Sequence, residues 1–152
     1  MVSGEQLLAL VKRLEETEGW HDRDLDADIH LALNAPGWII WKQTQYTGES
    51  YPVFKFPSKD YVQGFGHYPV PQYTWSVEAA LGLIPDNDEG QWHFYISNRA
   101  FIHNVFQKGL YKCAICPPNE SGIEKYEGIS PSLAISICIA ALKAHADIKE
   151  DK

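Results

Sequence analysis

The stretch GISPSLAISICIAALKA, residues 128–144, decides the fold that the sequence predicts. It carries no charged residue between Pro131 and Leu142, although the chain has 20 acidic and 13 basic residues. Ser130 followed by Pro131 predicts the start of a helix, because a serine oxygen caps free amides and proline at the first helical position loses no hydrogen bond. We therefore expect a helix that begins at this pair and forms the centre of the core.

This helix is expected to have one polar stripe. Ser132, Ser136 and Lys143 fall on one side of a helix that is otherwise apolar all round. Such a helix packs against a sheet with neighbours on its flanks, or in a contact between subunits. The segment from His145 to Lys152 is expected to fray into solvent.

Strand patterns precede the helix. Trp92, Phe94 and Ile96 alternate with more polar residues, which predicts a half-buried strand. Residues 99–107 and 110–117 continue in the same style, with turns at 97–98 and 108–109. Together these segments predict a three-strand antiparallel meander.

The earlier part of the chain predicts three more helices and a hairpin. Apolar stripes indicate helices over 5–18 and 21–34, the second capped by Asp22 or Asp24, and a third that begins at Ser76 and ends at Pro85. GWIIWKQ (37–43) and YPVFKFP (51–57) predict a hairpin, followed by a surface loop over 58–72. The order of elements predicts one α+β domain over 1–152, an αβα sandwich with a mainly antiparallel sheet and helices on both faces.

Composition excludes several classes of partner. A net charge of −7 repels phosphate polymers, so no nucleic acid polymer is expected to bind. The longest apolar run is too short for the roughly 20 residues of a membrane-spanning helix. The three cysteines do not all pair and the first residues lack the layout of a signal peptide, so we expect a reduced, cytoplasmic protein.

Several segments resemble a known family. DLDADIHLAL, VPQYTWSVEAALGLIP, QWHFYIS and EGISPSLAISICIAALKAHA are similar to patterns of the phage ABA sandwich domain, a family of small proteins of tailed phages and prophages. The resemblance spans about residues 25–146, and its motifs are helix caps and core positions. It implies an αβα sandwich, a phage or prophage origin and a bacterial host cell, but no catalytic residue. Residues 43–67 depart from the pattern.

Three groups of residues suggest chemistry without completing a site. Cys113 and Cys116 have the spacing of a zinc or redox pair, but no second ligand pair follows them, and two small apolar strand residues are the favoured interpretation. Asp26 and His30 lie on one helix face as a metal pair does, but acids at a helix start also favour the dipole. His93 and His103 lie on neighbouring predicted strands and could meet across the pairing. General-base catalysis also needs a nucleophile or a carboxylate partner, which the sequence does not place beside them, and a half-exposed strand histidine is the favoured interpretation. We expect no catalytic residue, no metal and no cofactor.

Aromatic and basic residues predict a ligand-binding surface instead. These residues could line a cleft in which a planar base stacks on the rings and lysines bind its phosphate. They could equally form a protein-binding patch, or the aromatic rings could simply cover a small sheet. The expected ligand-binding residues are Lys42, Tyr46, Tyr51, Lys55, Tyr61, Tyr68, His93 and Tyr95.

Three functions follow from these patterns. The first is a non-enzymatic binding module for a small ligand, such as a nucleotide signal of antiviral defence. The alternative is an interaction protein for a host or virion protein, and an enzyme comes third. If the chain forms a homo-oligomer, we expect the last helix or the aromatic hairpin to make the contact.

Overall fold

A computed structural model of the chain describes residues 2–34, 39–44, 50–55, 67–86, 90–98, 100–102, 105–120 and 124–151. In these ranges the elements are, in chain order, α1 (Gly4–Glu16), α2 (Arg23–Leu33), β1 (Ile39–Thr44), β2 (Ser50–Lys55), β3 (His67–Pro69), α3 (Val77–Leu81), β4 (His93–Ser97), β5 (Ala100–Ile102), β6 (Val105–Gln107), β7 (Tyr111–Cys116), β8 (Tyr126–Ser130) and α4 (Leu133–Glu150).

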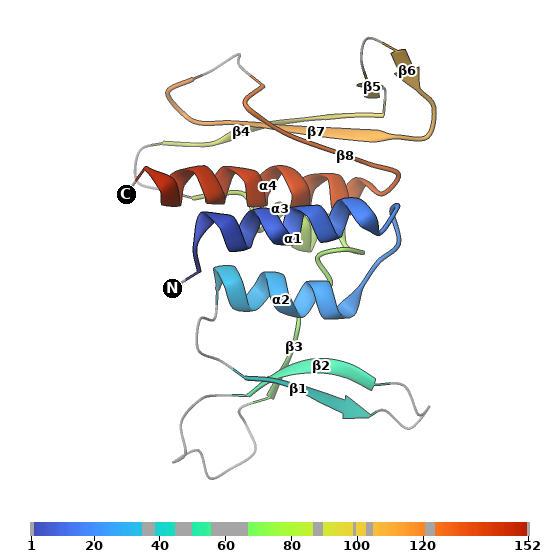
Figure 1. Ribbon diagram of the computed structural model, residues 1–152, viewed down its shortest axis with the longest axis vertical. Helices are drawn as coiled ribbons and strands as arrows, with labels where there is room; N and C mark the ends of the chain where they lie inside the picture. The colour runs from blue at the N-terminus through green and yellow to red at the C-terminus, as the bar shows by residue number, and fades with distance from the viewer. Residues whose placement is uncertain are drawn as a thin grey trace.

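Helix α4 is the centre of the core. It packs against α1, α3, β7 and β8, and every residue from 134 to 142 is buried (Figure 1). A helix without charged side chains over this length has no polar face that is suited to solvent. The rest of the protein must therefore cover it on nearly every side. The predicted central helix is confirmed, and its apolar residues are covered by the chain itself.

Both ends of α4 differ from the prediction. Ser132, not Ser130, is the N-cap, and its side chain accepts a hydrogen bond from the Ile135 amide. Ser130 is instead the last residue of β8, where it pairs with Tyr111. The residues expected to fray continue the helix as far as Glu150, and Lys149 near its end donates to the Val2 carbonyl.

The expected polar stripe on α4 is also wrong at Ser136. This side chain is completely buried, and its hydroxyl donates to the Leu133 carbonyl at 2.7 Å. A bond to the preceding turn satisfies the donor without water, so a serine can occupy a core position of a helix.

The strand order corrects the predicted meander. β4 pairs with β7 and β7 with β8, all antiparallel, whereas β5 and β6 form a separate two-stranded pair. The chain therefore leaves the sheet after β4, makes a small hairpin and returns through β7 to the centre of the sheet. β8 was not predicted, because the short segment YEGIS contains a glycine and a glutamate, which are depleted in strands.

The alternation predicted for β4 is wrong as well. His93, Phe94, Tyr95 and Ile96 are all exposed, while Trp92 just before the strand is buried. β4 lies at one edge of its sheet, and α3 beside it has only five residues. The helix layer therefore does not extend far enough to cover the inward-facing residues of this strand.

The other local predictions agree better. Asp22 caps α2 through bonds from the Asp24 and Leu25 amides, and Ser76 caps α3. α3 is shorter than expected, because Gly82 rather than Pro85 follows its last residue. The predicted hairpin is confirmed as β1 paired with β2, and β3 from the expected surface loop adds to it; residues 58–66 of that loop lie outside the described ranges.

The layers of the molecule can be followed in Figure 1. Sheet β4-β7-β8 lies on one side of α4 and α1, and sheet β1-β2-β3 lies beyond α2 on the other side. The predicted α+β class, with antiparallel strands and helices packed against them, is confirmed. The strands are divided between separate sheets, so that helices lie between two of them. None of the described helices is long and apolar enough to cross a membrane.

Candidate functional site

The predicted ligand-binding residues do not come together in one place. Lys42, Tyr51, Lys55 and Tyr68 belong to sheet β1-β2-β3, whereas His93 and Tyr95 lie on β4 beyond the helices (Figure 1). Tyr46 and Tyr61 lie outside the described residues, as does His103, which the sequence predicts on a strand neighbouring that of His93. A single cleft therefore cannot use residues of both groups.

The cysteines behave as apolar core residues. Cys113 and Cys116 lie on β7 and are completely buried, and burial raises the pKa of the Cys113 thiol to about 12. A thiol that stays protonated is a poor nucleophile and a poor metal ligand. The interpretation of CAIC as buried strand residues is confirmed.

The acidic helix α2 uses its carboxylates for structure. Asp26 is completely buried and accepts hydrogen bonds from the Thr74 amide at 2.7 Å and from Arg23 at 2.8 Å. Arg23 also donates to the carbonyls of Val70 and Pro71. His30 is bonded through Nδ1 to the hydroxyl of Tyr73, at 2.5 Å. Asp26 and His30 therefore fasten α2 to residues 70–74, and the described residues contain no group of three His, Cys, Asp or Glu side chains that could hold a metal ion.

A cleft at the carboxyl end of α4 is lined by many polar groups. It has a volume of about 670 Å³ and lies where the end of α4 meets the segments that follow α3 and β7. Small-molecule sites are typically about 300–1,000 Å³. The lining residues are Pro85, Asp86, Trp92, Pro117, Pro118, Asn119, Glu120, Lys125, Tyr126, His145, Asp147, Ile148 and Asp151.

Tyr126, Asp147 and Lys125 form a hydrogen-bonded network in this cleft. The Tyr126 hydroxyl donates to Oδ2 of Asp147, and Nζ of Lys125 lies 3.5 Å from the same oxygen. Lys125 also lies 3.3 Å from Oε1 of Glu120 and 5.4 Å from the centre of the Tyr126 ring. Burial and the neighbouring Asp147 raise the pKa of Tyr126 to about 12, so its hydroxyl remains a hydrogen-bond donor.

Trp92 forms the aromatic wall of the cleft. Its ring centre lies 6.3 Å from that of Tyr126, and the two planes are inclined at 35°. The indole Nε1 is buried and has no hydrogen-bond partner among the described residues. A buried donor left without an acceptor costs about 1–3 kcal/mol, so an acceptor brought to this position would be stabilised.

His145 is held in a fixed orientation at the cleft. Its Nε2 bonds the Leu83 carbonyl at 2.8 Å, which requires that this nitrogen carries the proton. Burial, reinforced by nearby Lys149, lowers its pKa, so the ring is neutral near pH 7. His145 therefore joins α4 to the end of α3 and does not add positive charge to the cleft.

The charge of the cleft is negative. Four carboxylates, those of Asp86, Glu120, Asp147 and Asp151, line it together with a single ammonium group, that of Lys125. Lys125 is already paired with Glu120 and Asp147. The cleft therefore favours a ligand that is neutral or positively charged.

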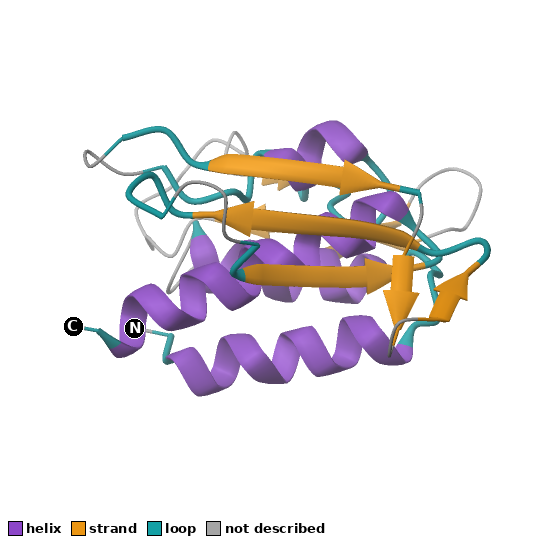
Figure 2. Cartoon of the chain, turned by 90° about the horizontal axis from the view of Figure 1, so that it is seen from above, coloured by secondary structure: helices purple, strands orange, loops and turns teal. Residues whose placement is uncertain are grey.

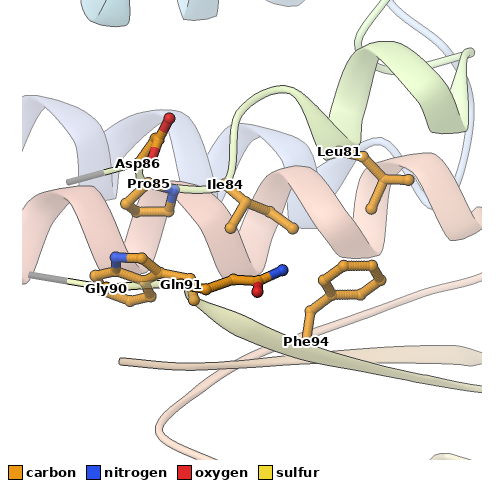
Figure 3. Close-up of a pocket in the computed structure, with 8 residues that line it drawn as sticks. Leu81, Ile84, Pro85, Asp86, Gly90, Gln91 and Phe94 are labelled. Carbon is orange, nitrogen blue, oxygen red and sulfur yellow. The ribbon is translucent and has the colours of Figure 1, made fainter. Parts of the chain in front are cut away.

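A second, more apolar pocket of about 420 Å³ adjoins the cleft (Figure 3). It shares Pro85, Asp86 and Trp92 with the cleft. Leu81 and Ile84 lie on its helix side, and Phe94 points towards them from β4. Trp92 thus lines both the cleft and this pocket.

Comparisons with protein-family models, with curated proteins and with solved structures gave no match for this chain. The resemblance to the phage ABA sandwich domain therefore stays a prediction, as does the phage origin that it implies.

Proposed function

We propose that this protein is a non-enzymatic binding module whose small ligand occupies the cleft between Trp92 and the carboxyl end of α4. The observation that carries the proposal is that the Trp92 side chain lines a cleft of about 670 Å³, while its indole N–H is buried and has no partner among the described residues. The ligand supplies the missing acceptor and packs against the rings of Trp92 and Tyr126.

Binding fits the polar groups of the cleft better than catalysis does. Tyr126, with its pKa raised to about 12, is a poor acid or base near neutral pH. His145 uses its protonated nitrogen to hold the Leu83 carbonyl. Both hydrogens are already donated within the protein, so these groups fix the walls of the cleft and do not transfer a proton to a ligand.

The charge of the cleft indicates the class of ligand. An amine or another cation is attracted by the four carboxylates, and its approach to the aromatic rings adds a cation–π contribution. A nucleotide signal, the ligand expected from the sequence, would bring its phosphates to the same carboxylates and would find Lys125 already paired. We therefore favour a cationic or neutral ligand that also carries a hydrogen-bond acceptor.

Calorimetry with two sets of compounds tests this proposal. Amines with an acceptor group, such as amino-acid amides and acetylated polyamines, are expected to bind, and cyclic dinucleotides and ADP-ribose derivatives are expected to bind more weakly. Trp92→Phe keeps an aromatic ring but removes the N–H, so the affinity should fall about tenfold, the equivalent of about 1.4 kcal/mol.

Trp75→Phe is the matched control, because Trp75 is exposed and does not line the cleft. It should leave the affinity unchanged. The absence of heat with every compound, or equal affinities for wild type and Trp92→Phe, would overturn the proposal.

A partner protein is the second candidate, and the exposed tryptophans favour it. Trp20 and Trp75 are 75% and 66% exposed, and the ring of His21 lies edge-on to Trp75 with centres 4.9 Å apart. Exposed tryptophans are frequent anchors of protein interfaces. This candidate corresponds to the host or virion partner given above as the alternative function. A partner recovered equally well with wild type and Trp75→Ala would contradict binding at this surface.

A further inference from the structure

We propose that a second copy of this chain pairs with the edge of β4 that lies away from β7, antiparallel to it, and joins the two β4-β7-β8 sheets into one. β4 lies at one edge of this sheet and β8 at the other (Figure 2). Within the described residues β4 pairs with β7 alone. Half of its backbone hydrogen-bonding groups therefore face away from the sheet and are suited to another strand.

The two edges of the sheet differ in charge. Residues 91–98, QWHFYISN, contain no lysine, arginine, aspartate, glutamate or proline. β8 at the opposite edge carries Glu127 within the strand and follows Glu124 and Lys125, whereas the charged residues nearest to β4, Glu89 and Arg99, lie outside the uncharged segment. Charged side chains and proline are the usual protection of an edge strand against pairing. Edge strand β8 thus carries a charge that disfavours pairing with a strand of another molecule, whereas β4 carries none.

The side chains of β4 provide an apolar surface for the contact. Phe94, Tyr95 and Ile96 are consecutive and are 45%, 53% and 41% exposed. Phe94 also lines the apolar pocket with Leu81 and Ile84, so the exposed surface continues from the strand into this pocket (Figure 3). Burial of such a surface is the main source of stability of an interface.

The absence of charge favours a second copy over a charged partner. In a chain with net charge −7, β4 is an uncharged segment at which two copies can approach each other. Twofold antiparallel pairing places identical segments opposite one another, and like charges in that position are destabilising. A basic or acidic strand of another protein would find no counter-charge on β4.

A register centred on Tyr95 matches side chains across the twofold axis. Tyr95 then lies opposite Tyr95 of the second copy, and Phe94 lies opposite Ile96 of the second copy. Phe94 and Ile96 are on the face of the sheet that contacts α4, since their partners on β7, Ile115 and Cys113, belong to the buried core. The contact therefore extends both the sheet and the apolar layer beneath it.

Sedimentation of the full chain over a range of concentrations tests this proposal. Wild type is expected to be in equilibrium between monomer and dimer, and Ile96→Lys is expected to raise the dissociation constant at least tenfold. Leu8→Lys is the matched control, because Leu8 on α1 is exposed to a similar extent, 44% against 41% for Ile96, but lies on a helix. A wild type that is monomeric at every concentration, or an equal effect of both variants, would overturn the proposal.

Cross-linking tests the register independently. The native cysteines are buried, so in Tyr95→Cys the new thiol is the accessible one among the described residues. Residues opposite each other in an antiparallel pair have Cα atoms about 4.5–5.5 Å apart, which is within the range of a disulfide. Mild oxidation should give a covalent dimer of Tyr95→Cys and none of Leu8→Cys. No covalent dimer of Tyr95→Cys would contradict the pairing centred on Tyr95.

Discussion

Asp26 shows how one side chain can hold two segments together at an electrostatic cost. Its carboxylate is completely buried, and burial raises its pKa above the ordinary value of 3.8 in spite of the bonds from Thr74 and Arg23. The bonds compensate part of the desolvation and connect α2 to residue 74. The sequence showed an acid near a helix start, and Asp22 is indeed the cap. It could not show that Asp26 is buried, because Thr74 lies far along the chain.

The raised pKa of Asp26 predicts a pH dependence of stability. The folded chain binds a proton at Asp26 more readily than the unfolded chain, so this group contributes stability in acid that is lost as the pH rises through the folded-state pKa. Asp26→Asn cannot ionise. The free energy of unfolding of wild type relative to Asp26→Asn should therefore decrease from acid to neutral pH, as measured by urea denaturation.

Two further variants complete this test. Asp28→Asn removes one exposed negative charge from the same helix, together with its ion pair to Arg13, and controls for net charge. Asp26→Ala leaves Arg23 and the Thr74 amide without their acceptor, and should cost about 3 kcal/mol. A constant or increasing difference between wild type and Asp26→Asn would show that the environment of Asp26 does not oppose its ionisation.

The contact between β8 and α4 depends on a residue without a side chain. A Cβ at Gly128 would clash with the Ser136 carbonyl oxygen and lie 2.9 Å from the Ala140 amide nitrogen. The strand can therefore approach the helix backbone closely because residue 128 is glycine. The sequence predicted α4 from its composition, but it gave no sign of this approach, since it depends on where β8 lies.

Gly128→Ala should loosen this contact. The added methyl group meets backbone atoms of α4, which cannot move aside as a flexible side chain would, so we expect a loss of about 3 kcal/mol in the free energy of unfolding. Gly82→Ala is the control, because Gly82 has a helical φ of −65° and its nearest contact, the Ala79 carbonyl oxygen, would lie at 3.2 Å. Equal stabilities of the two variants in chemical denaturation would contradict the close approach of β8.

The arrangement of layers was the part of the fold least accessible from sequence. Local signals gave α1, α2, α4 and the β1–β2 hairpin, because caps and apolar periods act over a few residues. The pairing of β4 with β7 depends on contacts beyond the β5–β6 pair, so the meander was wrong. The cleft is assembled from residues 85, 86, 92, 117–120, 125, 126, 145, 147, 148 and 151, which form no local motif. Trp92 was visible as an aromatic residue of a strand, but only the packed structure shows that its N–H has no partner among the described residues.

The central claim is that α4 is enclosed by the rest of the chain and that the fold depends on it. Native-state hydrogen exchange of the amides of residues 135–142 tests this claim most directly. These amides should open only when the whole chain unfolds, so their opening free energy should equal the free energy of unfolding obtained with denaturant. Opening free energies well below that value, similar to those of amides in the exposed strand β4, would contradict the claim.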